Sequence, residues 1–187
     1  MVSSRGHRFS PVHLDDPHFL RRPYDRWQAY GQSKTANIQF AVALDRRHAA
    51  DGIRAFAVHP GSIVGTGLEK HLDPAELVAA GVMRPDGSPI LDTARGLKTV
   101  SQGAATQLWC AASPQLQGHG GVYCEDVDIA GWMAPRHEGR PMAEALEARG
   151  VMPYAVDLAA AEALWALSEQ LLDAPDADVS PVQDLTA

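Results

Sequence analysis

A long helical pattern that leads into a short apolar run constrains the fold of this chain most. Residues 28–50 carry apolar side chains at helical spacing, and Gly52 follows at a position where helices commonly end. The run Ile53–Val58 is mostly apolar and is closed by Pro60-Gly61, which is typical of a strand buried in a parallel sheet. A helix that feeds a buried strand predicts an α/β fold.

The rest of the chain alternates in the same way between strand-like and helix-like segments. Residues 5–26 are predicted as a loop, because prolines interrupt them. The other predicted elements are a strand stub at Met1–Ser4, a short helix at 74–80, a helix at Thr99–Ala112, a strand at Val122–Glu125 and a helix at Val156–Leu172. The 187 residues suffice for one domain with a sizeable core.

The charge balance narrows the range of partners. The chain has 16 Lys and Arg against 23 Asp and Glu, and this net charge of −7 argues against a nucleic-acid partner, since phosphate backbones need basic surfaces. No apolar run approaches the roughly 20 residues that span a bilayer, so no membrane partner is predicted. Cys110 and Cys124 fit a reducing compartment as ordinary buried thiols, and we expect a cytoplasmic protein.

Tyr30 and Lys34 form the sharpest chemical motif, Tyr-Gly-Gln-Ser-Lys. Their spacing places both side chains on one face of the predicted helix, about one turn apart. A free phenol has a pKa of about 10, and a neighbouring ammonium lowers it by favouring the phenolate. The pair is therefore a candidate general acid/base. The alternative is an aromatic ring that merely covers a lysine on a solvated helix face, since such pairs are common.

The segments that flank this motif strengthen the catalytic interpretation. Ser4 ends the predicted strand stub, and Pro60-Gly61 end the strand that follows the helix. In a strand–helix–strand unit both strand ends open on the same edge, where open α/β sheets bind ligands. A serine hydroxyl there can hydrogen-bond a substrate carbonyl oxygen that Tyr30 protonates. The alternatives are that Ser4 is a plain turn residue and that Pro60-Gly61 only terminate a strand.

Several phrases of the sequence resemble the short-chain dehydrogenase/reductase family. They are VSSRGHRF at 2–9, YGQSK at 30–34 and VHPG at 58–61, and the resemblance extends over residues 2–172. Within the family, YGQSKTANIQF, QGAAT, GGVYCEDVDIA and LWALSEQLL are similar to the branch of retinol dehydrogenases and WW domain-containing oxidoreductases. The resemblance implies the C-terminal portion of a Rossmann-type, doubly wound parallel sheet, here incomplete.

The resemblance also implies an activity, hydride transfer between a nicotinamide cofactor and an alcohol, aldehyde or ketone. Carried over, Tyr30 is the catalytic acid/base, Lys34 lowers its pKa and holds the nicotinamide ribose, and Ser4 orients the substrate oxygen. The residues that would line the nicotinamide side are Pro60, Gly61 and Ile63. The cofactor supplies the hydride, and the protein supplies position and a proton. NADP and NAD both remain open, and likeness to the branch favours NADP.

One part of the family pattern is missing. The glycine-rich turn that binds the cofactor phosphates should precede the Tyr30 helix, but the chain starts at the Ser4 strand. Gly61, Gly65 and Gly67 have a similar spacing, yet they follow that helix, so we reject them as a phosphate site.

The missing part has consequences for the domain and its sheet. We expect residues 1–172 to form a partial short-chain dehydrogenase/reductase domain and residues 173–187 to form a disordered acidic tail. Parallel strands are normally paired on both edges, so a partial sheet should expose an edge that favours self-association. The alternative to an oxidoreductase is accordingly a truncated, non-catalytic remnant that acts through association with a partner.

The remaining candidate sites are weaker. His7, His13 and His18 lie in one predicted loop without a ligand-spaced cysteine or acidic partner, so no metal site is predicted. The segment 65–95 mixes apolar and charged residues and would shape a pocket for a small or medium apolar substrate. An acidic cluster at the last predicted strand is expected to form a solvated loop; its members are Glu125, Asp126 and Asp128.

Overall fold

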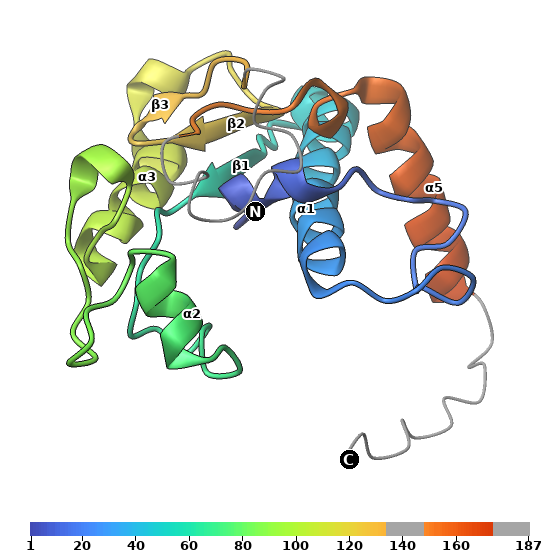
Figure 1. Ribbon diagram of the computed structural model, residues 1–187. Coiled ribbons are helices and arrows are strands. Elements are labelled where there is room, and N and C mark those ends of the chain that lie inside the picture. Colours follow the sequence, from blue (N-terminus) through green and yellow to red (C-terminus); the bar gives the residue numbers. More distant parts are fainter. Residues whose placement is uncertain (134–147, 174–187) are drawn as a thin grey trace.

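The computed structural model describes residues 1–133 and 148–173 (Figure 1). Their main elements are the helices α1 (Arg26–His48), α2 (Pro74–Ala79), α3 (Val100–Ala112) and α5 (Leu158–Asp173) and the strands β1 (Phe56–His59), β2 (Val122–Glu125) and β3 (Asp128–Ile129). A 3-10 helix, η1 (Arg5–Phe9), stands at the start of the predicted loop. Within the two described ranges no helix is long and apolar enough to cross a membrane. The predicted tail lies, from residue 174 on, outside the described residues.

The strands form one sheet in the order β1-β2-β3. β1 and β2 are parallel, with Val58 opposite Cys124, and β3 runs antiparallel to β2. On its other edge β1 makes a parallel bridge to Val2, where the Ser3 N–H donates to the Val58 carbonyl at 2.8 Å. The predicted strand stub is thus reduced to a single bridge. The mixed α/β architecture, consistent with part of a Rossmann-type fold, is confirmed.

Helix α1 begins two residues earlier than the apolar pattern indicates, because Asp25 caps it. The Asp25 carboxylate accepts hydrogen bonds from the N–H groups of Trp27 and Gln28, at 3.0 and 2.7 Å. At its other end α1 passes into a 3-10 turn, after which Gly52 adopts a left-handed conformation with φ of 81°. The helix stop predicted at Gly52 is confirmed.

Strand β1 begins at Phe56, three residues later than predicted, because Asp45 of α1 binds the segment before it. The Asp45 carboxylate accepts from the Ala55 N–H at 3.0 Å and from Nε of Arg54 at 2.8 Å. The turn that leads into β2 passes close to this carboxylate: a Cβ on Gly120 would lie 1.9 Å from Asp45 Oδ1. The same acidic side chain thus fixes the entry to β1 and requires a glycine before β2.

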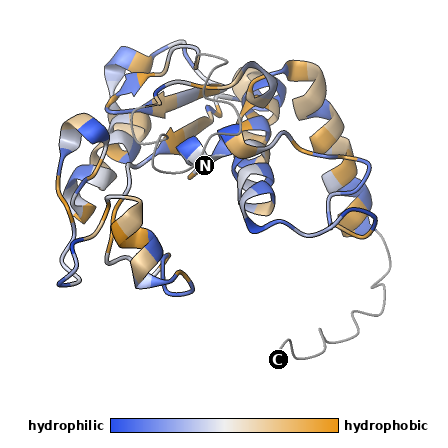
Figure 2. Cartoon of the chain, viewed as in Figure 1, coloured by the Kyte–Doolittle hydropathy of each residue, from blue (hydrophilic) through white to orange (hydrophobic). Residues whose placement is uncertain are grey.

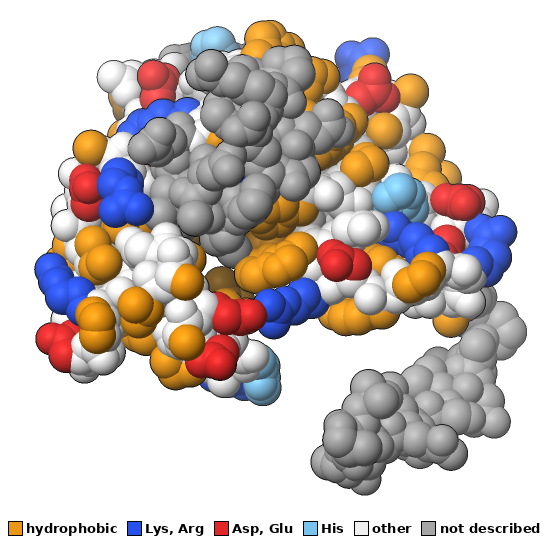
Figure 3. Space-filling model, viewed as in Figure 1, with side chains coloured by type: hydrophobic (Ala, Val, Ile, Leu, Met, Phe, Trp, Pro, Cys, Tyr) orange, Lys and Arg blue, Asp and Glu red, His pale blue; other side chains and the backbone are white. Residues whose placement is uncertain are grey.

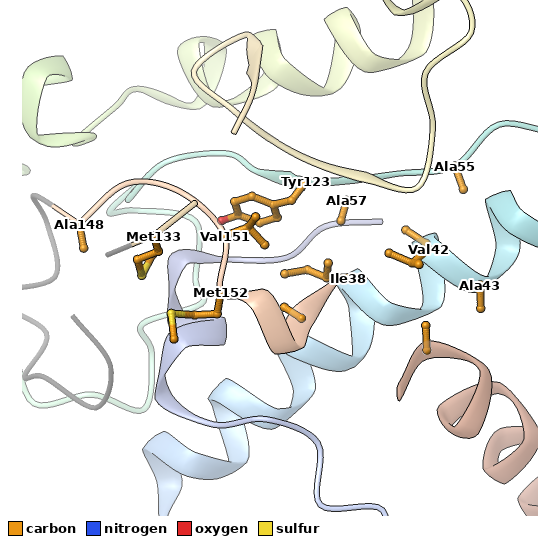
Figure 4. Packing of buried hydrophobic residues seen from close by; sticks show 13 residues of the cluster. Ile38, Val42, Ala43, Ala55, Ala57, Tyr123, Met133, Ala148, Val151 and Met152 are labelled. Atoms are coloured by element: carbon orange, nitrogen blue, oxygen red, sulfur yellow. The ribbon is translucent and has the colours of Figure 1, made fainter. Parts of the chain in front are cut away.

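The sheet is covered by α1 on one face and by α3 on the other. Tyr123 of β2 and Ala57 of β1 point toward Ile38 of α1, within the main hydrophobic core (Figure 4). Side chains alternate along a strand, so Cys124 and Val58 point to the opposite face, against which α3 packs. The alternation sets the register, because a slip by one residue would exchange the two buried faces.

The outer helices differ in how they attach. Trp165 of α5 stacks on Phe40 of α1, with ring centres 5.3 Å apart and an interplanar angle of 17°. Helix α2 stands apart from the sheet and belongs to a second, smaller apolar cluster around Val82 and Leu97. Figure 2 shows the central strands as hydrophobic, whereas the segment around α2 mixes hydrophobic and hydrophilic residues. The segment that was predicted to shape a pocket is therefore attached more loosely than the sheet.

A tight hairpin joins β2 to β3, where a solvated loop was expected. Asp126 and Val127 form its tip, and both have positive φ, 53° and 62°. The Val127 N–H donates to Thr106 Oγ1 of α3 at 3.1 Å. Glu125, at the end of β2, is only 6% exposed. The expectation of a solvated loop is wrong for Glu125, which ends a buried strand.

Candidate active site

A cavity of about 560 Å³ lies between η1, the beginning of α1, the turn after β1 and the segment around α2. Ser4, Tyr30 and His59 supply polar groups to its wall. Much of the remaining wall is apolar and includes Phe9, Trp27, Ile63, Leu68, Leu72 and Leu77. In the space-filling view, hydrophobic side chains lie among charged ones over the segment around α2 (Figure 3). Charged side chains such as Arg26, Glu69 and Glu76 also line it, so the cavity combines polar and charged groups with a largely apolar wall.

Close packing of η1 on α1 brings Ser4 and Tyr30 together. Their hydroxyls are hydrogen-bonded, and the Ser4 hydroxyl also accepts from the Gly6 N–H at 3.0 Å. A Cβ on Gly6 would lie 2.4 Å from Tyr30 Cε1, and a Cβ on Gly31 would lie 2.7 Å from Phe9 Cβ. Ser4 and Tyr30, which the sequence placed in one site, thus lie side by side, and two glycines in the motifs permit the approach.

Lys34 lies one turn along α1 from Tyr30, as the spacing predicts. Its Nζ is placed over the Tyr30 ring, 5.5 Å from the ring centre. The hydroxyl of Ser3 donates to the Lys34 carbonyl at 2.8 Å. The first serine of the pair therefore holds the helix backbone, and the second faces Tyr30.

The pKa of Tyr30 is raised above its ordinary value. Burial of the phenol raises it, and the hydrogen bond with Ser4 opposes this rise only in part. The expectation that Lys34 lowers the pKa of Tyr30 stays a prediction: the Lys34 ammonium lies over the ring, and burial is the main influence on this pKa. Tyr30 is a neutral phenol at neutral pH.

The turn after β1 holds the residues that were expected on the nicotinamide side. Gly61 and Ile63 line the cavity, whereas Pro60 and Lys34 are not among its described lining residues. Gly61 has φ of 102°, and a Cβ there would lie 2.7 Å from Cδ of Lys98. A Cβ on Gly103 of α3 would lie 2.2 Å from Ile63 Cδ1. Protein packing thus holds this turn from two sides and sets Ile63 in the cavity wall.

His59 is a site residue that the sequence reasoning missed. It ends β1, lines the cavity and is 4% exposed. Neither ring nitrogen has a hydrogen-bond partner within the described part of the chain. Burial, together with the charges of Arg5 and Lys98, lowers its pKa well below the ordinary value, so the ring is neutral. Its position directly before Pro60-Gly61 was the available sequence signal.

A partly buried group of ion pairs next to Ser4 was missed as well. Arg5 Nε lies 2.9 Å from Glu125 Oε2, and both side chains are 7% exposed. Asp126 pairs with Nζ of Lys98 and with Nη1 of Arg149, each at 2.5 Å. Burial alone would raise the pKa of Asp126, but these cations hold it below its ordinary value. The cluster ties the segment after Ser4 to the end of β2.

His7 was considered as a metal ligand, but both of its ring nitrogens contact backbone groups of the chain. Its Nδ1 lies 2.7 Å from the Ser4 carbonyl, and its Nε2 accepts from the Met152 N–H at 3.0 Å. Burial lowers the pKa of His7 to about 4. Within the described ranges no group of three or more His, Cys, Asp or Glu could hold a metal ion.

The residues present fit one part of a nicotinamide cofactor. The Tyr30 phenol and the Lys34 ammonium on one face of α1 are donors suited to ribose hydroxyls, and Ile63 offers an apolar wall. A phosphate cradle needs backbone N–H groups at a helix start. Gly65 and Gly67 do not open a helix, since α2 starts only at Pro74. The described residues therefore fit the ribose and nicotinamide but show no phosphate cradle.

Comparison with known proteins gives a consistent class. No family profile matches the chain. A protein named Probable oxidoreductase from Streptomyces lividans is 42% identical over 175 residues, which are 93% of this chain and 54% of that protein. The short-chain dehydrogenase/reductase prx1 of Penicillium rubens is 37% identical over 172 residues, 92% of this chain and 46% of that protein. The WW domain-containing oxidoreductase of Homo sapiens is 31% identical over 179 residues, and the match covers 92% of this chain and 36% of that protein.

A solved structure shows the same arrangement. The crystal structure of an uncharacterized protein from Mycobacterium paratuberculosis matches with a TM-score of 0.51 and 29% sequence identity, over 91% of this chain and 48% of that one. The relatives all carry the name of an oxidoreductase or a dehydrogenase/reductase. Within that class the chain is homologous to the short-chain dehydrogenase/reductases and the WW domain-containing oxidoreductases, and the family resemblance is confirmed. The chain spans about half the length of the curated relatives it matches.

Proposed function

We propose that this chain supplies the proton-transferring and substrate-binding part of an oxidoreductase that moves a hydride between a nicotinamide cofactor and an alcohol or carbonyl group. The observation that carries the proposal is the hydrogen-bonded pair of Ser4 and Tyr30 in the wall of a largely apolar cavity. The oxidoreductase relatives support it. Residues 1–172 would act as one domain in this role.

The proton step follows from the state of Tyr30. The phenol gives its proton to the carbonyl oxygen of the substrate, and the Ser4 hydroxyl donates to the same oxygen and orients it. Because burial raises the pKa of Tyr30, the phenol is protonated at neutral pH. A protonated Tyr30 can act as the acid in carbonyl reduction, and the same group would act as the base in the reverse reaction.

The cofactor, NADP or NAD, would supply the hydride from its nicotinamide ring when bound. Lys34 and Tyr30 would hold the ribose hydroxyls, and Pro60, Gly61 and Ile63 would face the nicotinamide. The likeness to retinol dehydrogenases and WW domain-containing oxidoreductases favours NADP. The apolar wall around Ile63 suits an aldehyde or ketone with a small or medium apolar body.

Titration of the purified chain with NADPH and with NADH tests the cofactor part of the proposal. We expect saturable binding that weakens about tenfold in Lys34→Met, since a hydrogen bond to a charged group is lost. Lys70→Met, at an exposed lysine, is the matched control and should bind as the wild type does. Absence of binding by the wild-type chain, or equal binding by Lys34→Met, would contradict the proposal.

Association through the sheet edge is the second candidate, and the exposure of that edge favours it. Met1 and Val2 lie beside β1 and are 46% and 47% exposed. Unpaired strand edges pair readily with other chains, and a charge on the edge prevents this. Sedimentation velocity should therefore show concentration-dependent dimers that Val2→Lys abolishes. A monomer at every concentration would exclude this candidate.

A further inference from the structure

The side of α3 that faces the sheet carries a cysteine. Gly103, Thr106 and Cys110 follow one another at intervals of three and four residues, so they share one face of the helix. Gly103 packs on Ile63, and Thr106 Oγ1 accepts the Val127 N–H of the β2–β3 hairpin. Both contacts are with the sheet and its loops. Cys110 therefore faces the sheet, one turn beyond Thr106.

The other cysteine of the chain points back at this helix. Cys124 lies within β2 between Tyr123, which packs against α1, and Glu125, and it is 0% exposed. Alternation along the strand directs its side chain to the α3 face. The two thiols meet there: Cys124 is hydrogen-bonded to the sulfur of Cys110.

The two thiols are not equivalent. The hydrogen bond from Cys124 lowers the pKa of Cys110, although burial opposes this. The same bond, with burial, raises the pKa of Cys124. Cys110 is half-buried and Cys124 is buried. Cys110 is thus the thiol that ionises first and that a reagent from solvent reaches first.

We propose that Cys110 and Cys124 are a redox-sensitive pair, which a peroxide or a small-molecule disulfide converts reversibly into an intramolecular disulfide between α3 and β2. With hydrogen peroxide, the Cys110 sulfur attacks one oxygen, the O–O bond breaks, and the products are a sulfenic acid and water. The Cys124 sulfur then attacks the Cys110 sulfur, an S–S bond forms, and a second water leaves. Two thiols are oxidised and one peroxide is reduced to two waters.

With a disulfide such as oxidised glutathione, the same chemistry runs by exchange. Cys110 forms a mixed disulfide and releases one glutathione thiol, and Cys124 displaces the second. Cys110 and Cys124 were expected to be two ordinary buried thiols. Because one lies on α3, the other lies on β2 and the two are in contact, each is placed to react with the other. The disulfide would link α3 to β2 and would thereby fix the face of α3 on which Gly103 packs against Ile63.

Equilibration of the native chain in glutathione redox buffers, followed by acid quenching and intact-mass analysis, tests the proposal. We expect a monomer that has lost two hydrogen atoms and both titratable thiols, with one linked peptide pair containing Cys110 and Cys124. In the native chain, the effective concentration of one thiol near the other should exceed the roughly millimolar value that a flexible linker gives. In denaturant, this effective concentration should fall to about that millimolar value. Reduction should restore both thiols.

Two single variants separate the steps. Cys124→Ser should stop at a mixed disulfide with glutathione on Cys110, and Cys110→Ser should react more slowly than Cys124→Ser, since Cys124 is buried. The wild-type measurement needs neither variant to fold. Disulfide-linked dimers, native thiols that stay unlinked in oxidised glutathione, or an effective concentration no higher in the native chain than in denaturant would overturn the proposal.

Discussion

Arg5 and Glu125 form a buried ion pair, with Arg5 Nε 2.9 Å from Glu125 Oε2, across 120 residues of sequence. The pair joins the segment directly after Ser4 to the end of β2. The second Glu125 oxygen accepts the Gly150 N–H at 2.6 Å. Three segments that are far apart in the chain therefore converge on one carboxylate beside the candidate site.

Removing one partner of this pair should destabilise the chain strongly. Glu125→Ala leaves the Arg5 guanidinium buried without this carboxylate, and we expect a loss of about 3 kcal/mol in the free energy of unfolding. The double variant Arg5→Met/Glu125→Met should recover most of the loss, because no buried charge is then left uncompensated. Urea unfolding measures all three proteins.

An exposed ion pair supplies the control. Arg21 and Asp15 also pair, but their side chains are 66% and 78% exposed, so Asp15→Asn should change the free energy of unfolding by less than about 0.5 kcal/mol. If Glu125→Ala and Asp15→Asn cost the same, the Arg5–Glu125 pair has no special role in stability.

Stability should fall as the pH decreases from about 7 to about 5, because His7 is buried in its neutral form. Its pKa is about 4 in the folded chain and about 6.5 when unfolded, so the unfolded chain binds more protons between these values. The stabilisation that comes from neutral His7 is fully present above the pKa of His7 in the unfolded chain and is lost as the pH falls. At pH 5 the free energy of unfolding should be lower by about 2 kcal/mol. His59, whose pKa is also lowered, acts in the same direction.

Urea unfolding at both pH values checks this expectation. His7→Gln should show a smaller loss of stability on acidification than the wild type. His119→Gln, at an exposed position, is the control and should lose as much as the wild type. An equal loss in the wild type and in His7→Gln would show that His7 does not titrate as described.

The sequence predicts the framework of this fold well, because the framework depends on local patterns. The helix stop at Gly52 and the limits of β2 were predicted correctly. The helix start was missed because Asp25 lies outside the apolar pattern and acts only as a cap. The strand start was missed because Asp45, a side chain of another element, binds the backbone before Phe56.

The hairpin after β2 stores strain that a substitution should relieve. Val127 is β-branched and has φ of 62°, a left-handed conformation that costs L-residues about 1–2 kcal/mol. Its side chain is 44% exposed, so little burial is lost on replacement. Val127→Asn should raise the free energy of unfolding by about 1 kcal/mol, measured by urea unfolding. A variant less stable than the wild type would show that packing of the valine outweighs the strain.

A methyl group at Gly120 should disturb the Asp45 carboxylate. The added Cβ would lie 1.9 Å from Asp45 Oδ1 and 2.4 Å from Arg54 Nη2, so their ion pair must shift. We expect Gly120→Ala to cost about 2 kcal/mol by thermal or urea unfolding. Gly131→Ala is the matched control, since a Cβ there meets no atom within 4 Å. Comparable stability of the two variants would refute this account of the turn.

The candidate site was predictable only where its residues lie in motifs. Ser4 and Tyr30 lie close together, as their positions at a strand end and on the next helix indicate, and their catalytic roles stay a prediction. The Arg5–Glu125 pair joins residues so distant that no local pattern indicates it. The raised pKa of Tyr30 was not foreseen either, because it depends on burial of the phenol by residues that are distant in the sequence.

The rate of NADPH-dependent reduction of an apolar aldehyde, compared between Tyr30→Phe and Tyr24→Phe, tests the central claim most directly. Tyr24 is 71% exposed and serves as the control. We predict that Tyr30→Phe lowers kcat by about 100-fold or more, because the proton donor is lost, and that Tyr24→Phe behaves as the wild type does. Tyr30→Phe should still bind NADPH, though more weakly, since one contact to the ribose is lost with the hydroxyl. Equal rates in all three proteins, or a wild-type chain that neither binds NADPH nor reduces the aldehyde, would contradict the assignment of Tyr30 as the acid of this site.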